Sequence, residues 1–127
     1  MTTDDIIAKL EGIAAEMQSV YYDNEVYMDE KFAAERNGLD NVTGNMGTYD
    51  LAHWLDVGDY EKATDIVNSN IAFFDEMMAI SERLGYGAHA ASRGFDVTKP
   101  AGRYWTLSVL GQKYCNELID LINNLNK

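Results

Sequence analysis

The sequence predicts an all-α protein: residues 1–127 form a single domain, a helical bundle or irregular helical array of four to five helices. Three observations support this prediction. Apolar residues recur at spacings of three and four over long segments, which is the period of an α-helix. Strand patterns are nearly absent, and glycines separate the periodic segments. At 127 residues and 46% hydrophobic composition, the chain can bury one core without disulfides or metals.

The first predicted helix covers residues 2–36. Its start has the spacing of a capping box, in which Thr2 and Asp5 bond each other's backbone. The buried stripe consists of Ile6, Leu10, Ile13, Met17 and Val20. This stripe fails near Asp23, so the segment is either one long helix or two helices that meet there. We favour one helix, ended by Gly38 and followed by a loop.

A helical hairpin is predicted next. Thr48 can cap a short helix that is stopped or kinked at Gly58, and Asp59 can cap a longer helix that ends at Gly85. The buried face of the longer helix is expected to contain Tyr60, Ala63, Val67, Ile71, Phe74 and Met78. Residues 54–63 resemble the turn of a tetratricopeptide unit. No second copy follows at the repeat period, so the resemblance implies only a helix-turn-helix hairpin.

The last predicted helix extends from about Arg103 to Asn124, after a long connection over residues 85–102. Lys99 precedes the only proline and should be extended. A short strand over 95–98 is an alternative that has no visible partner. The apolar face of the helix is broad, which indicates a central helix or one that also contacts a partner. We expect this face to contain Leu107, Leu110, Tyr114, Leu118, Leu121 and Leu125.

Charge is distributed unevenly along the chain. Residues 1–82 contain 18 Asp and Glu against four Lys and Arg, whereas residues 83–127 contain three acids and six bases. The net charge of -11 argues against direct binding to nucleic acid or to an anionic membrane. It favours a basic protein partner, or it serves only solubility. We find no signal peptide or membrane-spanning run, so a cytoplasmic location is expected.

The acidic residues support the first functional hypothesis, a protein-interaction module. Gathered on one face, they could imitate the phosphates of nucleic acid and block the groove of a basic, nucleic-acid-binding enzyme. In size and charge the chain resembles small acidic inhibitors encoded by phages and mobile elements, such as anti-defence DNA mimics. The alternative is an acidic surface that is simply solvated. The candidate contacts are Asp23, Asp29, Glu30, Asp56, Asp59, Glu61, Asp65, Asp75 and Glu76.

The basic segment 83–105 supports an alternative function, binding of a nucleotide or another anionic small molecule. Its glycines permit close backbone approach, its arginines can bind phosphate as planar forks, and its aromatic rings can stack on a base. The glycine spacing matches neither the dinucleotide fingerprint nor a Walker loop. In a third interpretation, the bases pair with the acidic body, within one chain or across a homo-oligomer. The candidate ligand-binding residues are Arg83, His89, Arg93, Lys99 and Arg103.

The sequence contains no motif that indicates catalysis or metal binding. His53 follows Asp50 by three residues, but a ferritin-like diiron centre requires two Glu-x-x-His motifs and this chain has none. Cys115 lies among apolar residues, where a buried and inert thiol is expected. It forms a dyad with a histidine only if folding brings the two together. We therefore predict that the protein is not an enzyme and requires no cofactor or metal.

Overall fold

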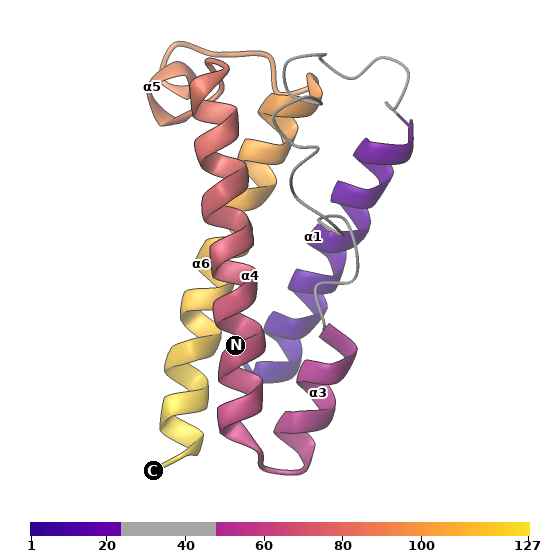
Figure 1. The fold of residues 1–127 in the computed structure, drawn as a ribbon, viewed down its shortest axis with the longest axis vertical. Helices are drawn as coiled ribbons and strands as arrows, with labels where there is room; N and C mark the ends of the chain where they lie inside the picture. The colour runs from indigo at the N-terminus through magenta and orange to yellow at the C-terminus, as the bar shows by residue number, and fades with distance from the viewer. Residues whose placement is uncertain (24–47) are drawn as a thin grey trace.

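A computed structural model describes the backbone of residues 1–23 and 48–127 and the side chains of residues 1–20 and 50–127. These residues form an all-α fold, which confirms the predicted fold class, and the alternative strand over 95–98 is wrong (Figure 1). The rest of the predicted 2–36 helix and the loop after it lie outside the described residues. The helices are α1 (Thr3–Asp23), α3 (Thr48–Asp56), α4 (Tyr60–Arg83), α5 (Ala88–Ala91) and α6 (Pro100–Leu125).

Helix α6 is the centre of the array. It packs most extensively against α4 and next against α1, while α3 contacts both α4 and α1. Figure 1 shows that α4 and α6 run in opposite directions along the long axis of the molecule. The short helix α3 descends beside the first half of α4, and α5 lies at the opposite end. The hairpin turn and the α4–α6 connection therefore occupy opposite ends of the molecule.

The start of α1 has the predicted capping box. The Thr2 amide donates to Asp5 Oδ2 at 3.0 Å, and the Asp5 amide donates to Thr2 Oγ1 at 3.2 Å. These hydrogen bonds from Thr2 hold the pKa of the Asp5 carboxyl below its usual value. The predicted apolar stripe is buried at Ile6, Leu10, Ile13 and Met17, and Val20 packs at its edge.

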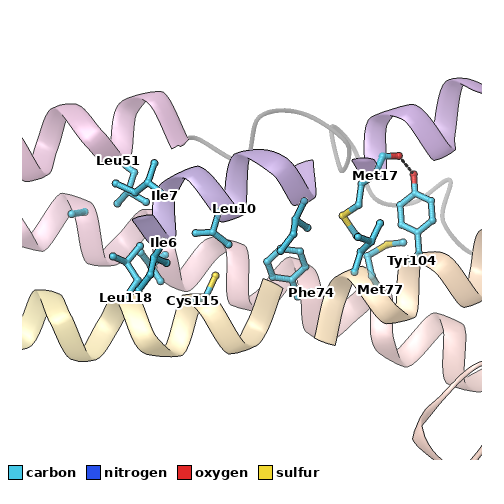
Figure 2. Packing of buried hydrophobic residues seen from close by; sticks show 14 of the residues in the cluster. Ile6, Ile7, Leu10, Met17, Leu51, Phe74, Met77, Tyr104, Cys115 and Leu118 are labelled. Carbon is cyan, nitrogen blue, oxygen red and sulfur yellow. Dashed lines mark hydrogen bonds between the residues drawn. The ribbon is translucent and has the colours of Figure 1, made fainter. Parts of the chain in front are cut away.

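The core lies between α1, α4 and α6, where the side chains of Met17, Phe74 and Met77 meet (Figure 2). Tyr104 extends from α6 to α1, where its hydroxyl donates to the Met17 carbonyl oxygen at 3.0 Å. Gly111 lies directly against the Phe74 ring, which occupies the space that a Cβ would need. Close packing of α6 on α4 therefore depends on a small residue at this position.

The buried face of α6 differs from the predicted one. Leu110 and Leu125 are 39% and 50% exposed, whereas Ser108 and Gly111 are buried. Small residues let the α6 backbone approach α4, whereas Leu110 and Leu125 lie on the exposed side of the helix and Leu107 and Leu118 are buried as predicted. Along α4 the buried stripe likewise passes through Asn70 and Met77, leaving the predicted Ile71 and Met78 only partly buried.

The α3–α4 turn joins two helices through three residues. The Gly58 amide donates to the Leu55 carbonyl at 3.2 Å, and the Asp59 amide donates to the Trp54 carbonyl at 2.9 Å. This pair of bonds is a Schellman motif, and Gly58 supplies the left-handed residue that it requires, with φ +79°. Asp59 also caps α4, since its Oδ1 accepts from the Lys62 amide at 3.2 Å. One residue therefore ends α3 and begins α4.

The α4–α6 connection is shorter than predicted. Helix α6 begins at Pro100, three residues before the expected Arg103, because proline is well suited to the first helical position. Lys99 before it is extended, as expected, with ψ 141°. Helix α5 interrupts the connection, so the basic segment 83–105 is only partly a loop. Its first residue belongs to α4 and its last six to α6.

Candidate functional site

The outward face of α4 carries carboxylates with helical spacing. Glu61, Asp65 and Glu76 are exposed; Asp65 follows Glu61 by four residues and Glu76 follows Asp65 by eleven, so all three point the same way. The opposite face contains the buried residues Ala63 and Phe74. Within the residues that the structure describes, these three carboxylates make no ion pair or hydrogen bond. Figure 1 shows α4 along the middle of the molecule, beside α3.

The turn before α4 adds a fourth exposed carboxylate. Asp56, the last residue of α3, is exposed, and Val57 beside it is 58% exposed. We call Asp56, Glu61, Asp65 and Glu76 the α3–α4 acidic face. It contains four of the nine acidic residues proposed from the sequence.

The other five acidic candidates are not part of the α3–α4 acidic face. Asp59 is engaged in the turn, and Asp75 accepts a hydrogen bond from the Gln112 amide of α6. Asp23 is the last residue of α1, and its side chain is not described. Asp29 and Glu30 lie outside the described residues. The acidic face therefore rests on α3 and α4, and Asp59 and Asp75 each make a hydrogen bond within the fold.

Lys62 lies beside the acidic face and is held by two neighbours. Its ammonium is 4.1 Å from the centre of the Trp54 ring and 3.9 Å from Asp59 Oδ2. The His53 ring meets Trp54 edge-on, with centroids 4.8 Å apart. Lys9, on α1, lies 5.5 Å from the Tyr114 ring of α6. Neither lysine forms an ion pair with the α3–α4 acidic face.

The five basic candidates are dispersed over the far end of the molecule. Arg83 ends α4, His89 is on α5, and Arg93 and Lys99 are exposed in the connection. Arg103 is in the first turn of α6, where its guanidinium forms an ion pair with Glu16 of α1. For Arg103 this contact matches the interpretation in which the basic segment pairs with the acidic body.

One open cavity of about 400 Å³ lies where α4 meets α5. Of the five basic candidates, only His89 lines it, and the carboxylate-bearing Glu82 lines it too. The other lining residues are small: Gly85, Gly87, Ala88 and Ala90. A carboxylate in the wall repels a phosphate, so this cavity lacks the charge that an anionic ligand requires.

The aromatic residues of the connection pack against one another. Phe95 lies edge-on to Tyr86, with centroids 5.6 Å apart, and edge-on to Trp105, with centroids 5.5 Å apart. Gly102 lies beneath them, and a Cβ there would come within 2.7 Å of the Asp96 carbonyl oxygen. The three rings thus form a small satellite core that closes the end of the molecule.

The described residues offer no catalytic constellation. Cys115 is fully buried, whereas His53 and His89 are exposed, so no hydrogen bond joins the thiol to either imidazole. Burial raises the pKa of the Cys115 thiol to about 12, which keeps it protonated and unreactive. No group of three or more His, Cys, Asp or Glu in residues 1–23 and 48–127 could hold a metal ion.

Sequence reasoning missed the contact between Trp54 and Lys62. Its signal lay in the turn itself: a Schellman motif brings the residue at C3 close to the start of the next helix when that helix begins at once.

None of the described helices has the length and apolar composition needed to cross a membrane. Comparison with protein-family models, curated proteins and solved structures finds no match for this chain.

Proposed function

We propose that this protein is a protein-interaction module whose α3–α4 acidic face binds a basic partner, with a nucleic-acid-binding protein as the partner class. The observation that carries the proposal is the outward stripe of Glu61, Asp65 and Glu76, joined at the turn by Asp56. Exposed carboxylates that make no ion pair with residues 1–23 and 48–127 are available to attract lysine and arginine on another protein.

The number of carboxylates along the stripe limits how closely it can imitate the phosphates of a DNA duplex. From Glu61 to Glu76, α4 rises about 22 Å, a length over which duplex DNA carries about 13 negative charges. The outward stripe carries three. We therefore propose that the face replaces phosphates at a few positions, each meeting one basic side chain of the partner, rather than reproducing a whole duplex.

Affinity capture with two matched baits tests this proposal. Glu61→Lys with Asp65→Lys reverses the stripe, while Glu117→Lys with Asp120→Lys makes the same change in charge on α6. We expect a basic protein to be retained by the wild type and by the α6 variant, and lost by the α4 variant. Its affinity should fall roughly tenfold or more between low and high salt, and DNA should compete for it.

Circular dichroism of both variants provides the folding control, since all four positions lie on helix surfaces. Equal retention by both charge-reversed baits would show that only net charge matters. Binding that persists at high salt would rule out electrostatic recognition by this face. Retention of the partner in the presence of excess DNA would keep the acidic interface but exclude its nucleic-acid-binding groove.

A further inference from the structure

The first turn of α4 contains a cation where a helix disfavours one. Lys62 is the third residue of α4, close to the positive end of the helix dipole. Its ammonium is nevertheless held 4.1 Å from the Trp54 ring centre and 3.9 Å from Asp59 Oδ2. An aromatic face and a carboxylate converging on one charge are the elements of a cation-binding site.

We infer that Trp54 and Asp59 form a subsite for an arginine side chain of the basic partner, and that Lys62 occupies it in the free protein. This inference rests on the proposed function and names the residue type that the acidic face recognises. Arginine suits the subsite better than lysine does, because its planar guanidinium can stack on the indole and at the same time donate to Asp59 Oδ2, the oxygen that does not cap α4.

The internal contact is weak enough to be exchanged. The side chains of Lys62 and Asp59 are 57% and 37% exposed, so water screens their attraction. An exposed cation–π contact and an exposed ion pair together change an equilibrium by a factor of roughly ten. An arginine that gains both contacts and lies beside other carboxylates can therefore displace Lys62.

The surroundings of the subsite favour a bound arginine. His53 packs edge-on against Trp54 and restrains the indole, while Asp56 and Glu61 place two exposed carboxylates in the same turn. Val57, 58% exposed, offers an apolar contact for the methylene groups of a long basic side chain. The subsite therefore lies at the turn end of the α3–α4 acidic face.

Titration with a hexa-arginine peptide tests the inference, with the Trp54 indole resonance in NMR as the readout. We expect this resonance to move in the wild type, and Lys62→Met to tighten binding roughly five- to tenfold. Lys9→Met is the matched control. It removes the same charge and a similar lysine–aromatic contact from α1, and should tighten binding less than twofold. A hexa-lysine peptide should bind Lys62→Met more weakly than hexa-arginine does.

Equal effects of Lys62→Met and Lys9→Met, or a Trp54 resonance that stays still at saturation, would overturn the subsite. So would equal affinity for the two peptides. A different result would contradict the proposed function. If Glu61→Lys with Asp65→Lys binds hexa-arginine as tightly as the wild type does, the acidic face has no role, whatever Lys62→Met shows. If that variant binds hexa-arginine more weakly but the Trp54 resonance of the wild type does not move, only the subsite is excluded.

Discussion

Helices α3 and α4 end in the same way, yet the two ends of the molecule differ. Two backbone hydrogen bonds close each helix. One is donated by a glycine with positive φ, Gly58 or Gly85, and the other by the residue that follows it. At the first end the next residue is Asp59, which starts another helix at once. At the second it is Tyr86, whose ring packs against Phe95. The residue after the glycine decides whether the chain turns tightly or builds a packed connection.

This difference also separates the charges. The α3–α4 turn is too short to fold back over its neighbours, so Asp56 and Glu61 remain exposed. The longer connection brings Arg103 to the start of α6, where it pairs with Glu16. In the described part of the chain, one end of the molecule thus carries exposed carboxylates, while at the other Arg103 joins α6 to α1.

The largest expected effect comes from removing the satellite core. Phe95→Ala takes away the ring between Tyr86 and Trp105 and should lower the free energy of unfolding by about 2–3 kcal/mol. Val57→Ala, in the exposed turn, should cost no more than about 0.5 kcal/mol. Urea unfolding of both variants measures the comparison, and equal midpoints would contradict it.

Two glycine substitutions separate steric from conformational demands. Gly102→Ala should cost about 1–2 kcal/mol, because its Cβ would lie 2.7 Å from the Asp96 carbonyl oxygen and 3.0 Å from Phe95. Gly58→Ala should cost about 1 kcal/mol, since φ is +79° and the space is open.

Asparagine at the same positions sharpens this test. Asn tolerates the left-handed conformation, so Gly58→Asn should cost less than Gly58→Ala. The larger side chain makes Gly102→Asn cost more than Gly102→Ala. Thermal or urea unfolding of the four variants gives the order. If asparagine ranks the same way against alanine at both positions, the distinction between the two ends is wrong.

The smallest expected effect is a local response to acid. The Thr98 hydroxyl and amide donate to Asp96 Oδ1 and hold the pKa of this carboxyl below its usual value. A lowered folded-state pKa stabilises the connection above the unfolded pKa, and this stabilisation is lost as pH falls through the folded value. The Thr98 amide resonance should therefore shift as the pH falls below the usual pKa of an aspartate carboxyl. Asp96→Asn should abolish that shift, and its persistence there would assign the titration to another group.

Much of the helical fold was predictable because its signals are local. The capping box at Thr2 and Asp5, the Asp59 cap and the glycine at position 58 each act within a few residues, and all were confirmed. The leucine spacing predicts a start near Arg103, whereas α6 begins three residues earlier at Pro100, because proline is favoured at the first helical position.

The candidate site was predictable only as a set of exposed acids. Sequence spacing indicated that Glu61, Asp65 and Glu76 avoid the buried stripe of α4, and they do. It did not indicate that Asp75 bonds Gln112 or that Asp59 joins Lys62, because the first contact crosses to another helix and the second depends on the turn geometry.

The amino-acid sequence by itself determined the capping box of α1, the turn between α3 and α4 and which part of the chain carries negative charge, since these follow from neighbouring residues. Tertiary structure decided which face of α6 is buried, because Gly111 lets α4 approach and leaves Leu110 exposed. It also decided that Arg103 meets Glu16 and that Lys62 meets Trp54. Such contacts depend on how helices pack, and helical period carries no information about that.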